Sequence, residues 1–270
     1  MEFKKILDLH VHTDNSFDGQ HPATLFCERG QMLGLRAIAF TDHCDIDGYE
    51  EMNLERSVFQ SYFEIKKAQS AFRGKMIICT GIELGQPTYD LKTTESVINR
   101  LKFDYIICSI HNLRNMQDFY YLDYNKYDVD KLLDEYFDEL QILADWGNFD
   151  TLAHFTYPLR YITGDYKIPV DIKKYDEKIN SILEAIIKKD IALEINTSGL
   201  RQSLKLTMPD KDIVQKFHDM GGKYITIGSD AHYIEHLGMG IADGMKIAKD
   251  CGFDNVTLFQ NREPVQIPIE

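Results

Sequence analysis

Short apolar runs alternate along the chain with longer segments whose apolar residues recur at helical spacing. Seven of these runs carry aliphatic residues at successive positions, as strands buried on both faces do. They are Ile6–Val11, Arg36–Phe40, Lys75–Ile82, Phe103–Ile110, Phe149–Ala153, Ile191–Ile195 and Tyr224–Ile227. We expect each run to form a parallel strand.

Seven amphipathic segments of helix length lie between or after these runs. They are Ala23–Leu33, Glu55–Phe72, Thr93–Leu101, Val129–Asp145, Lys173–Lys189, Asp210–Met220 and Glu235–Asp250. Strands that alternate with helices in this way form a parallel sheet, which is either closed as a barrel or open and doubly wound.

The pattern favours a TIM-like (β/α)7 barrel over an open sheet. The glycine motifs of Rossmann folds and P-loops are absent, and seven repeats are many for an open sheet. No Gly/Ser linker or shift in composition divides the repeats, so we expect residues 1–270 to form a single domain. The tail Asn255–Phe259 could supply an eighth strand or an edge strand, and the pattern leaves both open.

Composition and charge narrow the class of protein. The 270 residues are 44% hydrophobic and 27% charged, which is typical of a globular protein with a full core. The net charge of −13, with no basic run, argues against nucleic acid as the main partner. There is no signal peptide, and no apolar stretch approaches the ~18 residues of a membrane helix. Five cysteines without a C-x-x-C pair read as reduced thiols, so we expect a cytoplasmic protein without membrane contact.

The positions of the histidines indicate a metal site. Six of the nine fall at the ends of expected strands: His10 and His12 after the first, His43 after the second, His111 after the fourth, His154 after the fifth and His232 after the seventh. Glu83 and Asp230 occupy equivalent positions after the third and seventh strands. The carboxyl ends of barrel strands meet at one mouth, where active sites form. Imidazoles with carboxylates suit zinc, iron or manganese, and the absence of thiolate ligands argues against a structural zinc site.

The same residues lie in motifs that resemble those of a known family. The motifs are Asp8-Leu9-His10-Val11-His12-Thr13, Thr41-Asp42-His43, Gly81-Ile82-Glu83, Ser109-Ile110-His111, Ala153-His154 and Gly228-Ser229-Asp230-Ala231-His232. In this order they resemble the PHP (polymerase and histidinol phosphatase) superfamily. The chain length, without any polymerase appendage, is similar to that of stand-alone histidinol-phosphate phosphatases. The resemblance implies a distorted seven-stranded β/α barrel with a trinuclear metal site at the carboxyl ends of its strands.

The resemblance also implies how the ligands divide among two to three divalent ions of Zn, Fe or Mn. His10, His12, Glu83 and Asp230 would hold the first ion, and Glu83 would bridge to a second ion held by His111 and His154. His43, His232 and Asp18 would hold the third. Asp18 stands where the family often has His, and His21 and Asp14 are nearby alternatives.

The implied reaction is hydrolysis of L-histidinol phosphate to L-histidinol and phosphate, a step of histidine biosynthesis. Two ions that share Glu83 would activate a bridging hydroxide to attack phosphorus. The third ion would offset charge on the phosphate oxygens. Glu83, Asp230 and His232 are the expected catalytic residues. Water held by a metal, His232 or Asp230 could protonate the leaving oxygen.

The expected substrate-binding residues lie in loops of the same mouth. Arg160 and Arg201 could clamp the phosphate, ahead of Arg114, and Asn196 could add a polar contact. The aromatic segment Asn112–Tyr127 could stack on a flat substrate ring or simply pack on the barrel. Acidic loop residues, Asp14 among them, could receive a substrate ammonium.

Two other functions remain open at this stage. One is hydrolysis of another small phosphomonoester or of nucleic-acid ends, which the net charge disfavours in its nucleic-acid form. The other is a catalytically inactive binding scaffold. A scaffold of that kind should have lost ligands, and every ligand position here is filled or has a plausible replacement. The oligomeric state is not indicated.

Overall fold

A computed structural model describes residues 6–270 of the chain. Its main sheet has seven parallel strands in the order β1-β2-β4-β5-β6-β7-β8, with β3 beside β4. The strands are β1 (Leu7–Val11), β2 (Ala37–Phe40), β3 (His43–Asp45), β4 (Ile77–Gly85), β5 (Tyr105–Ser109), β6 (Thr151–Leu152), β7 (Ala192–Asn196) and β8 (Ile225–Gly228). All seven apolar runs of the sequence therefore form strands, as predicted.

The sheet is nearly closed into a barrel. The amide of His12, which directly follows β1, donates to the carbonyl of Ala231, which follows β8, over 2.9 Å. Val11 and Ala231 form a parallel bridge at the same place. The predicted (β/α)7 barrel is confirmed, and its first and last strands meet at the carboxyl end.

Strands β2 and β3 are one strand interrupted by two residues. Phe40 pairs with Thr80 and His43 pairs with Glu83, so both pieces keep the same register on β4. The interruption at Thr41 and Asp42 separates the ladders without shifting the chain, and it places His43 directly beside Glu83.

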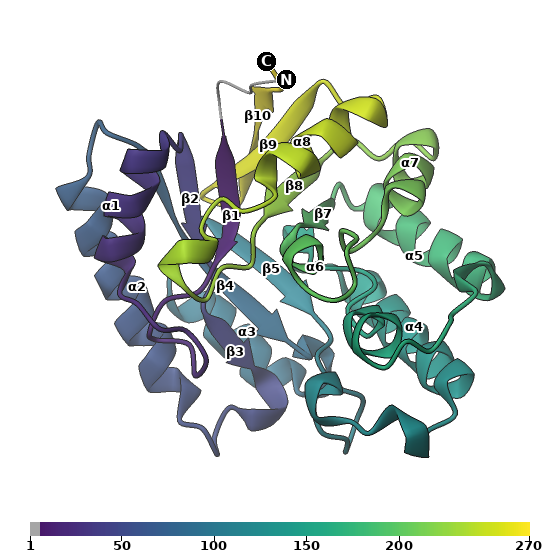
Figure 1. Ribbon diagram of the computed structural model, residues 1–270. Helices are drawn as coiled ribbons and strands as arrows, with labels where there is room; N and C mark the ends of the chain where they lie inside the picture. The colour runs from purple at the N-terminus through teal and green to yellow at the C-terminus, as the bar shows by residue number, and fades with distance from the viewer. Residues whose placement is uncertain (1–5) are drawn as a thin grey trace.

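Helices cover the outside of the barrel (Figure 1), with α1 and α2 on one side and α4 and α5 on the other. The α-helices are α1 (Ala23–Leu33), α2 (Leu54–Ala71), α3 (Leu91–Arg100), α4 (Val129–Trp146), α5 (Asp176–Lys188), α6 (Ser198–Arg201), α7 (Lys211–Asp219) and α8 (Ile241–Asp250). Shorter turns are the 3-10 helices η1 (Ile46–Gly48), η2 (Pro87–Tyr89), η3 (Phe119–Tyr121), η4 (Tyr124–Lys126), η6 (Ile172–Tyr175) and η7 (Ile234–His236), and the π-helix η5 (Arg160–Asp165).

The helix expected over Glu235–Asp250 is shorter than predicted. Only Ile234–His236 and Ile241–Asp250 are helical, because Gly238 and Gly240 between them adopt φ of 76° and 77°. Glycine reaches this left-handed region without strain, so it ends one helical turn before the next begins.

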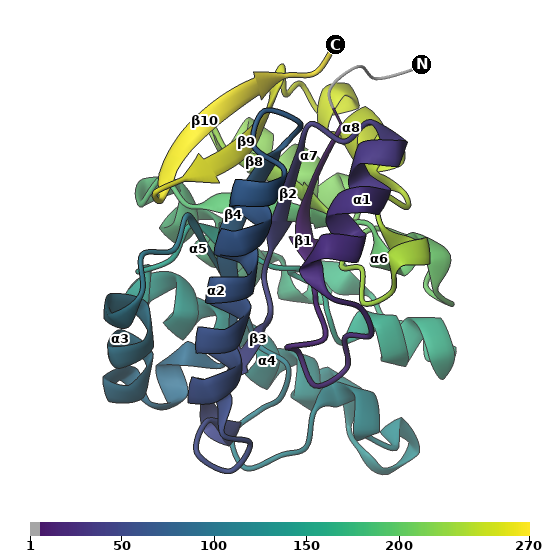
Figure 2. The same ribbon diagram turned by 90° about the vertical axis from the view of Figure 1, so that its left-hand side faces the viewer.

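The tail is neither an eighth barrel strand nor an edge strand. Strands β9 (Asn255–Gln260) and β10 (Glu263–Pro268) form a separate antiparallel hairpin. It lies across the end of the barrel where the parallel strands begin (Figure 2). Tyr105 at the start of β5 stacks on Phe259, with ring centroids 5.3 Å apart. The hairpin therefore closes the end opposite to the expected metal site.

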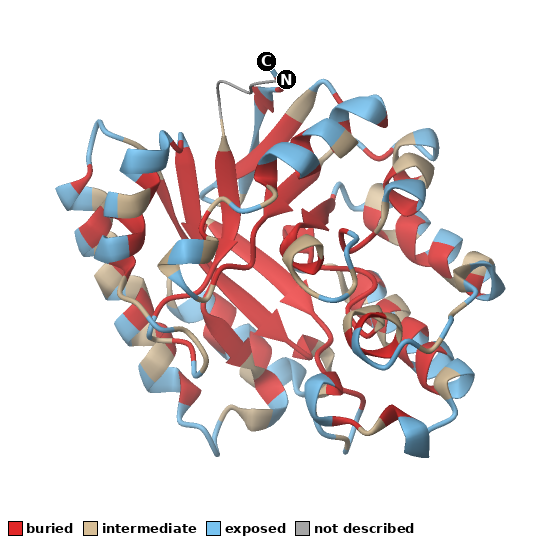
Figure 3. Ribbon diagram, viewed as in Figure 1, coloured by how far each residue is buried: buried red, intermediate tan, exposed pale blue. Residues whose placement is uncertain are grey.

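Burial follows the layers, with the parallel strands almost wholly buried and the outer faces of the helices exposed (Figure 3). Across residues 6–270, no helix is both long and apolar enough to span a membrane.

Candidate metal centre

The barrel brings the nine expected metal ligands to one end. His10 lies in β1 and His12 directly follows it, His43 lies in β3 and Glu83 in β4. The segments after β5, β6 and β8 carry His111, His154, Asp230 and His232, and the β1–α1 loop carries Asp18. All of these side chains except those of Asp18 and His232 are buried. Alternation along β1 puts His10 and His12 on the same face, which points into the barrel.

Glu83 lies at the centre of the cluster. Its Oε1 is 2.8 Å from His154 Nε2 and 3.2 Å from His111 Nε2. Its Oε2 is 3.3 Å from His10 Nε2 and 3.5 Å from His12 Nε2. One carboxylate thus offers each of its oxygens to a different pair of imidazoles, which is the geometry required of a bridging ligand.

Asp230 completes the group around His10 and His12. Its Oδ1 lies 3.5 Å from His12 Nε2 and 3.9 Å from His10 Nε2. The four side chains expected at the first ion therefore converge on one point.

A third group lies nearer the rim. Asp18 Oδ2 is 3.1 Å from His232 Nε2, and Asp18 Oδ1 is 3.7 Å from His43 Nε2. His43 also places its Nδ1 3.1 Å from Glu83 Oε2, so it lies between the rim group and the central carboxylate. Of the alternatives His21 and Asp14, the His21 ring packs against Phe26 and Tyr233, and Asp14 is exposed in the loop after β1.

The unpaired atoms of the cluster fit divalent cations. Within residues 6–270, His12 Nε2, His43 Nδ1 and Asp18 Oδ1 are buried and have no hydrogen-bond partner. Buried polar atoms are normally paired, so these three suggest ligands whose partner is an ion. Three overlapping sets have ligand atoms within 4.8 Å of one another: His12–His43–His232, His10–His12–Glu83 and His43–Glu83–His111. Nitrogen and oxygen donors without thiolates suit zinc, iron or manganese.

The electrostatics of the centre favour ionised carboxylates. Burial disfavours the charged form of Glu83, yet the imidazoles of His10, His43 and His111 hold its pKa well below the usual range. Asp230 also has a lowered pKa, because His10 and its other cationic neighbours outweigh the effect of burial. Burial tends to lower the pKa of His43, but the carboxylates of Glu83, Asp18 and Asp45 together raise it to about 9. Without metal, protons on the imidazoles balance the charge of the carboxylates. Metal ions bound to the same ring nitrogens would release these protons.

Two of the expected metal ligands have an unusual backbone conformation. His154 and Asp230 have φ of 45° and 54°, in the left-handed region that residues other than glycine seldom adopt. Strained conformations of this kind cluster at functional sites. Arg201 holds the second turn, because its Nη1 donates to Ser229 O over 2.5 Å and its Nη2 donates to Asp230 O over 2.7 Å. The predicted contact between Arg201 and phosphate stays a prediction.

The sequence analysis missed Glu194, which orients a metal ligand. Glu194 lies in β7, and its Oε1 accepts a 2.6 Å hydrogen bond from His10 Nδ1. Such a bond fixes the ring so that Nε2 points at the cluster. A Cβ at Gly228 would overlap both His10 and Glu194, so the glycine in β8 permits the pair. The available signal was a carboxylate inside the otherwise apolar run Ile191–Ile195.

Three further acids support the mouth. Asp45 Oδ1 is 3.1 Å from His111 Nδ1, which aims the Nε2 of that ring at Glu83. Asp42, in the β2–β3 interruption, accepts from Thr13 N at 2.6 Å and holds the loop after β1. Asp8 accepts from Ser229 N at 2.8 Å and holds the turn before Asp230. Asp8 and Asp42 belong to the recognised motifs, but their hydrogen-bond partners depend on the tertiary structure.

Arg160 lies at the edge of the centre, as expected for a phosphate contact. Its Nη2 donates to Asp230 Oδ2 over 3.0 Å and to Ser198 Oγ over 2.5 Å. Its Nε is buried and has no partner within residues 6–270. A guanidinium donor without a hydrogen-bond partner suits an anionic oxygen.

Asn196 and Arg114 are engaged elsewhere. Asn196 donates to Glu194 Oε2 over 3.2 Å, and its Oδ1 accepts from Ser198 Oγ over 2.6 Å. Arg114 pairs with Glu139 over 3.1 Å and lies above the Tyr89 ring on the outer surface. Asn196 thus contacts Glu194, the carboxylate that orients His10. Its predicted contact with substrate stays a prediction.

The aromatic segment Asn112–Tyr127 divides into buried and exposed residues. Phe119 and Tyr124 are buried, whereas Tyr120 and Tyr121 are 64% and 67% exposed. Tyr120 meets Tyr161, which belongs to η5, edge to face with ring centroids 5.8 Å apart. Part of the segment therefore packs on the barrel, and part of it borders the mouth.

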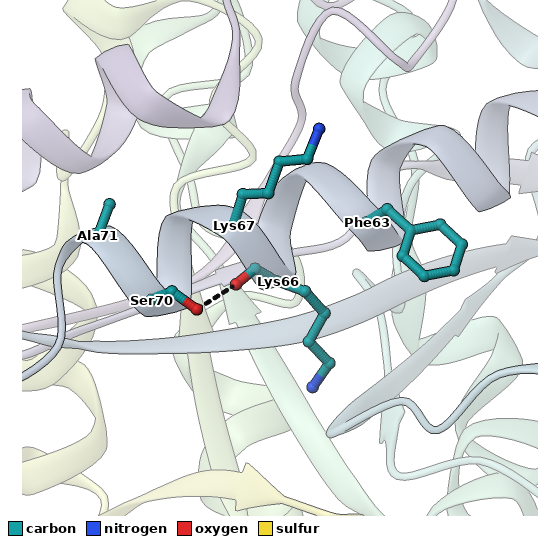
Figure 4. Close-up of a pocket in the computed structure, with 5 residues that line it drawn as sticks. All are labelled: Phe63, Lys66, Lys67, Ser70 and Ala71. Atoms are coloured by element: carbon teal, nitrogen blue, oxygen red, sulfur yellow. Dashed lines mark hydrogen bonds between the residues drawn. The ribbon is translucent and has the colours of Figure 1, made fainter.

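A second surface feature lies away from the centre. An open hollow on helix α2 is lined by Phe63, Lys66, Lys67, Ser70 and Ala71 (Figure 4). Its lysines point away from each other, and it contains neither a carboxylate nor a histidine. It offers no catalytic chemistry.

Comparisons with known proteins agree with this geometry. A family model described as "PHP domain" matches residues 8–198. A "Probable histidinol-phosphatase" of Thermotoga maritima is 30% identical over 92% of this chain and 94% of its own length. A "Histidinol-phosphatase" of Lactococcus lactis is 27% identical over 94% of each chain.

A solved structure shares the fold. The histidinol phosphate phosphatase of Lactococcus lactis, crystallised with zinc, L-histidinol and phosphate, superposes with a TM-score of 0.77 at 24% identity. The match covers 97% of this chain and 99% of that one. The family model spans more than half of the sequence and reaches from Asp8 in β1 to Ser198 after β7. The chain belongs to the PHP domain family.

Proposed function

We propose that this chain is a histidinol-phosphatase, which hydrolyses L-histidinol phosphate to L-histidinol and phosphate with two to three divalent metal ions. The observation that carries the proposal is Glu83, whose two oxygens face separate groups of imidazoles. Relatives named histidinol-phosphatase that match over nearly the whole chain support the choice of substrate.

The proposed ligands divide into three groups around the central carboxylate. Glu83 with His10, His12 and Asp230 forms the first group, Glu83 with His111 and His154 the second, and His43 with His232 and Asp18 the third. Ions bound there would lower the pKa of a coordinated water and neutralise phosphate oxygens. Short distances within the groups support this division: Glu83 Oε1 is 3.2 Å from His111 Nε2, and Asp18 Oδ2 is 3.1 Å from His232 Nε2.

Residues of the chain would bind the phosphate and position the reacting groups. Arg160 would donate its free Nε–H to a phosphate oxygen, while its Nη2 keeps Asp230 in place. Because the pKa of Asp230 is held low, this carboxyl is ionised at neutral pH and cannot protonate the leaving oxygen. His232 would bind the third ion as a neutral imidazole, and its Nδ1 lies 3.1 Å from the backbone oxygen of Asp230, so it is not the expected acid either. That leaves water as the expected proton donor to the leaving oxygen.

A panel of phosphomonoesters tests this function. The metal-loaded protein should have its highest kcat/KM with L-histidinol phosphate, and a chelator should abolish turnover until zinc or manganese is restored. Activity that survives complete removal of metal would contradict the metal mechanism. A much higher kcat/KM with an unrelated ester would contradict the choice of substrate.

A further inference from the structure

A row of polar groups lines the mouth beside His111 and His154. The Tyr157 ring packs on both imidazoles, with centroids 5.2 Å and 5.1 Å away. Its hydroxyl lies 3.0 Å from the hydroxyl of Tyr161 and donates to Asp118 Oδ1 over 3.3 Å. The two tyrosines thus connect the candidate metal centre to a carboxylate in another loop.

The same row begins at Arg160. Its guanidinium carbon lies 5.1 Å from the centre of the Tyr157 ring and 5.9 Å from that of Tyr161. The order along this side of the mouth is therefore Arg160, the two tyrosines and Asp118. A fixed positive charge stands at one end and a carboxylate at the other.

Asp118 is held in place but not neutralised. Its Oδ1 accepts from Tyr120 N over 2.7 Å, and the next residue, Phe119, donates its amide to His111 O over 2.9 Å. No Lys or Arg of residues 6–270 forms an ion pair with Asp118, and both of its accepted hydrogen bonds fall on Oδ1. Burial raises the pKa of this carboxyl, although the charge of His111 and the hydrogen bond from Tyr120 N oppose the shift.

Neighbouring acids are already occupied. Asp45 pairs with His111, and Asp47 accepts from Asn112 over 2.7 Å. Asp14, considered from the sequence, is exposed in the loop after β1. Of these acids, Asp118 alone combines a place on the wall of the mouth with a free oxygen.

The proposed substrate has matching charges. L-Histidinol phosphate carries its ammonium on the carbon next to the one that bears the ester oxygen, so cation and phosphate lie close together. We propose that Asp118 receives this ammonium while Arg160 contacts the phosphate, with Tyr157 and Tyr161 forming the wall between them. This inference rests on the proposed function and adds to it the residue that selects amine-bearing phosphomonoesters. Tyrosine rings beside the carboxylate also favour a cation.

Two esters that differ only in the amine provide the test. The metal-loaded wild-type protein should hydrolyse L-histidinol phosphate with a kcat/KM roughly 10- to 100-fold above that for 3-(imidazol-4-yl)propyl phosphate, because a charge-assisted contact is lost. Asp118→Asn should remove this preference by lowering kcat/KM for L-histidinol phosphate alone. The asparagine keeps an oxygen for Tyr120 N, and thermal melting would verify that the variant is folded.

Asp123→Asn is the matched control. Asp123 lies in the same loop and begins η4 as Asp118 begins η3, but it pairs with Lys126. This variant should keep the wild-type preference between the two esters. Calorimetry on the wild-type protein adds a readout without mutation: with phosphate present, L-histidinol should bind more tightly than the alcohol without the amine.

The outcomes separate the inference from the function on which it rests. Equal losses on both esters in Asp118→Asn, or an unchanged preference, would overturn the ammonium assignment. Equal kcat/KM for the two esters in the wild-type protein would also overturn it and leave histidinol phosphate hydrolysis standing. No turnover of either ester by the metal-loaded wild-type protein would remove the proposed function, and the ammonium assignment with it.

Discussion

The two ends of the barrel both bury carboxylates, but they satisfy them differently. At the closed end, Asp150 accepts from Arg262 Nε over 3.0 Å and from the amide of Ile106 over 2.8 Å. Asp104 accepts from Thr80 N over 2.9 Å, and Arg262 N donates to its backbone carbonyl. Each acid there has protein donors of its own.

At the open end, the side chain of Glu83 contacts imidazoles. Two of the ring nitrogens, His12 Nε2 and His43 Nδ1, have no hydrogen-bond partner within residues 6–270. Buried polar atoms without hydrogen-bond partners are unfavourable, so we expect this cluster to be less stable without metal than with it. The difference shows how to separate structural from functional charges: the former are paired by the chain itself, and the latter leave places for a cation.

The largest effect is expected when the central carboxylate loses its charge. Glu83→Gln should lower kcat for L-histidinol phosphate by roughly 1,000-fold, because the charge shared by two groups of ligands disappears. Steady-state kinetics and elemental analysis of the purified variant would check this. Near-wild-type turnover would contradict the bridging role of Glu83. It would also remove the distinction between structural carboxylates at the closed end of the barrel and functional ones at the open end.

The second effect is a pH dependence of metal binding. His43 has a pKa of about 9, and Glu83 and Asp45 hold the pKa of His111 well above its usual value despite burial. Only neutral imidazole binds metal, so zinc must displace protons below these pKa values, and affinity must rise with pH. Between pH 6 and pH 8, the apparent Kd of the metal-free protein for zinc should fall by at least about tenfold per pH unit. Titration against a chromophoric chelator would measure it, and a Kd independent of pH would refute these protonation states.

A smaller effect is expected from the residue behind His10. Glu194→Gln weakens the acceptor for His10 Nδ1 and should reduce metal affinity by roughly 10- to 100-fold. Excess metal should restore most of kcat, as expected if Glu194 positions a ligand without touching substrate. Glu184→Gln, which removes an exposed partner of Lys188, is the control and should change neither quantity. If excess metal failed to restore turnover, Glu194 would have a more direct role.

The smallest effect on the metal centre is expected from a substitution at the closed end of the barrel, Asp150→Asn. Burial raises the pKa of Asp150 to about 6, although Arg262 opposes the shift. The folded state therefore binds this proton more tightly than the unfolded state, and the associated stability is lost as the pH rises through about 6. Relative to Asp150→Asn, the wild-type free energy of unfolding should fall by up to about 3 kcal/mol between pH 4 and pH 7. Denaturant titrations would show it, with kcat unchanged; parallel stability curves would contradict the raised pKa.

Much of the fold was predictable because local patterns specify it. Each of the seven apolar runs became a strand, and the helix expected over Ala23–Leu33 has these bounds in the structure. The errors occurred where local pattern is ambiguous. The tail has the apolar content of a strand, but only its antiparallel partner, residues 263–268, shows that it forms a hairpin.

The sequence by itself determined which side chains gather at the mouth. Every expected ligand lies near the carboxyl end of a strand or in the segment after it, and the carboxyl ends of parallel strands must meet at one end of a barrel. The positions of His10, Glu83 and Asp230 in the chain therefore implied their proximity. The tertiary structure decided what each group contacts. Glu194 accepts a hydrogen bond from His10, Arg201 holds the turn at Asp230, and Asp118 keeps a free oxygen. These contacts could not be predicted from the sequence, because they depend on distances between segments far apart in the chain, which no periodic pattern encodes.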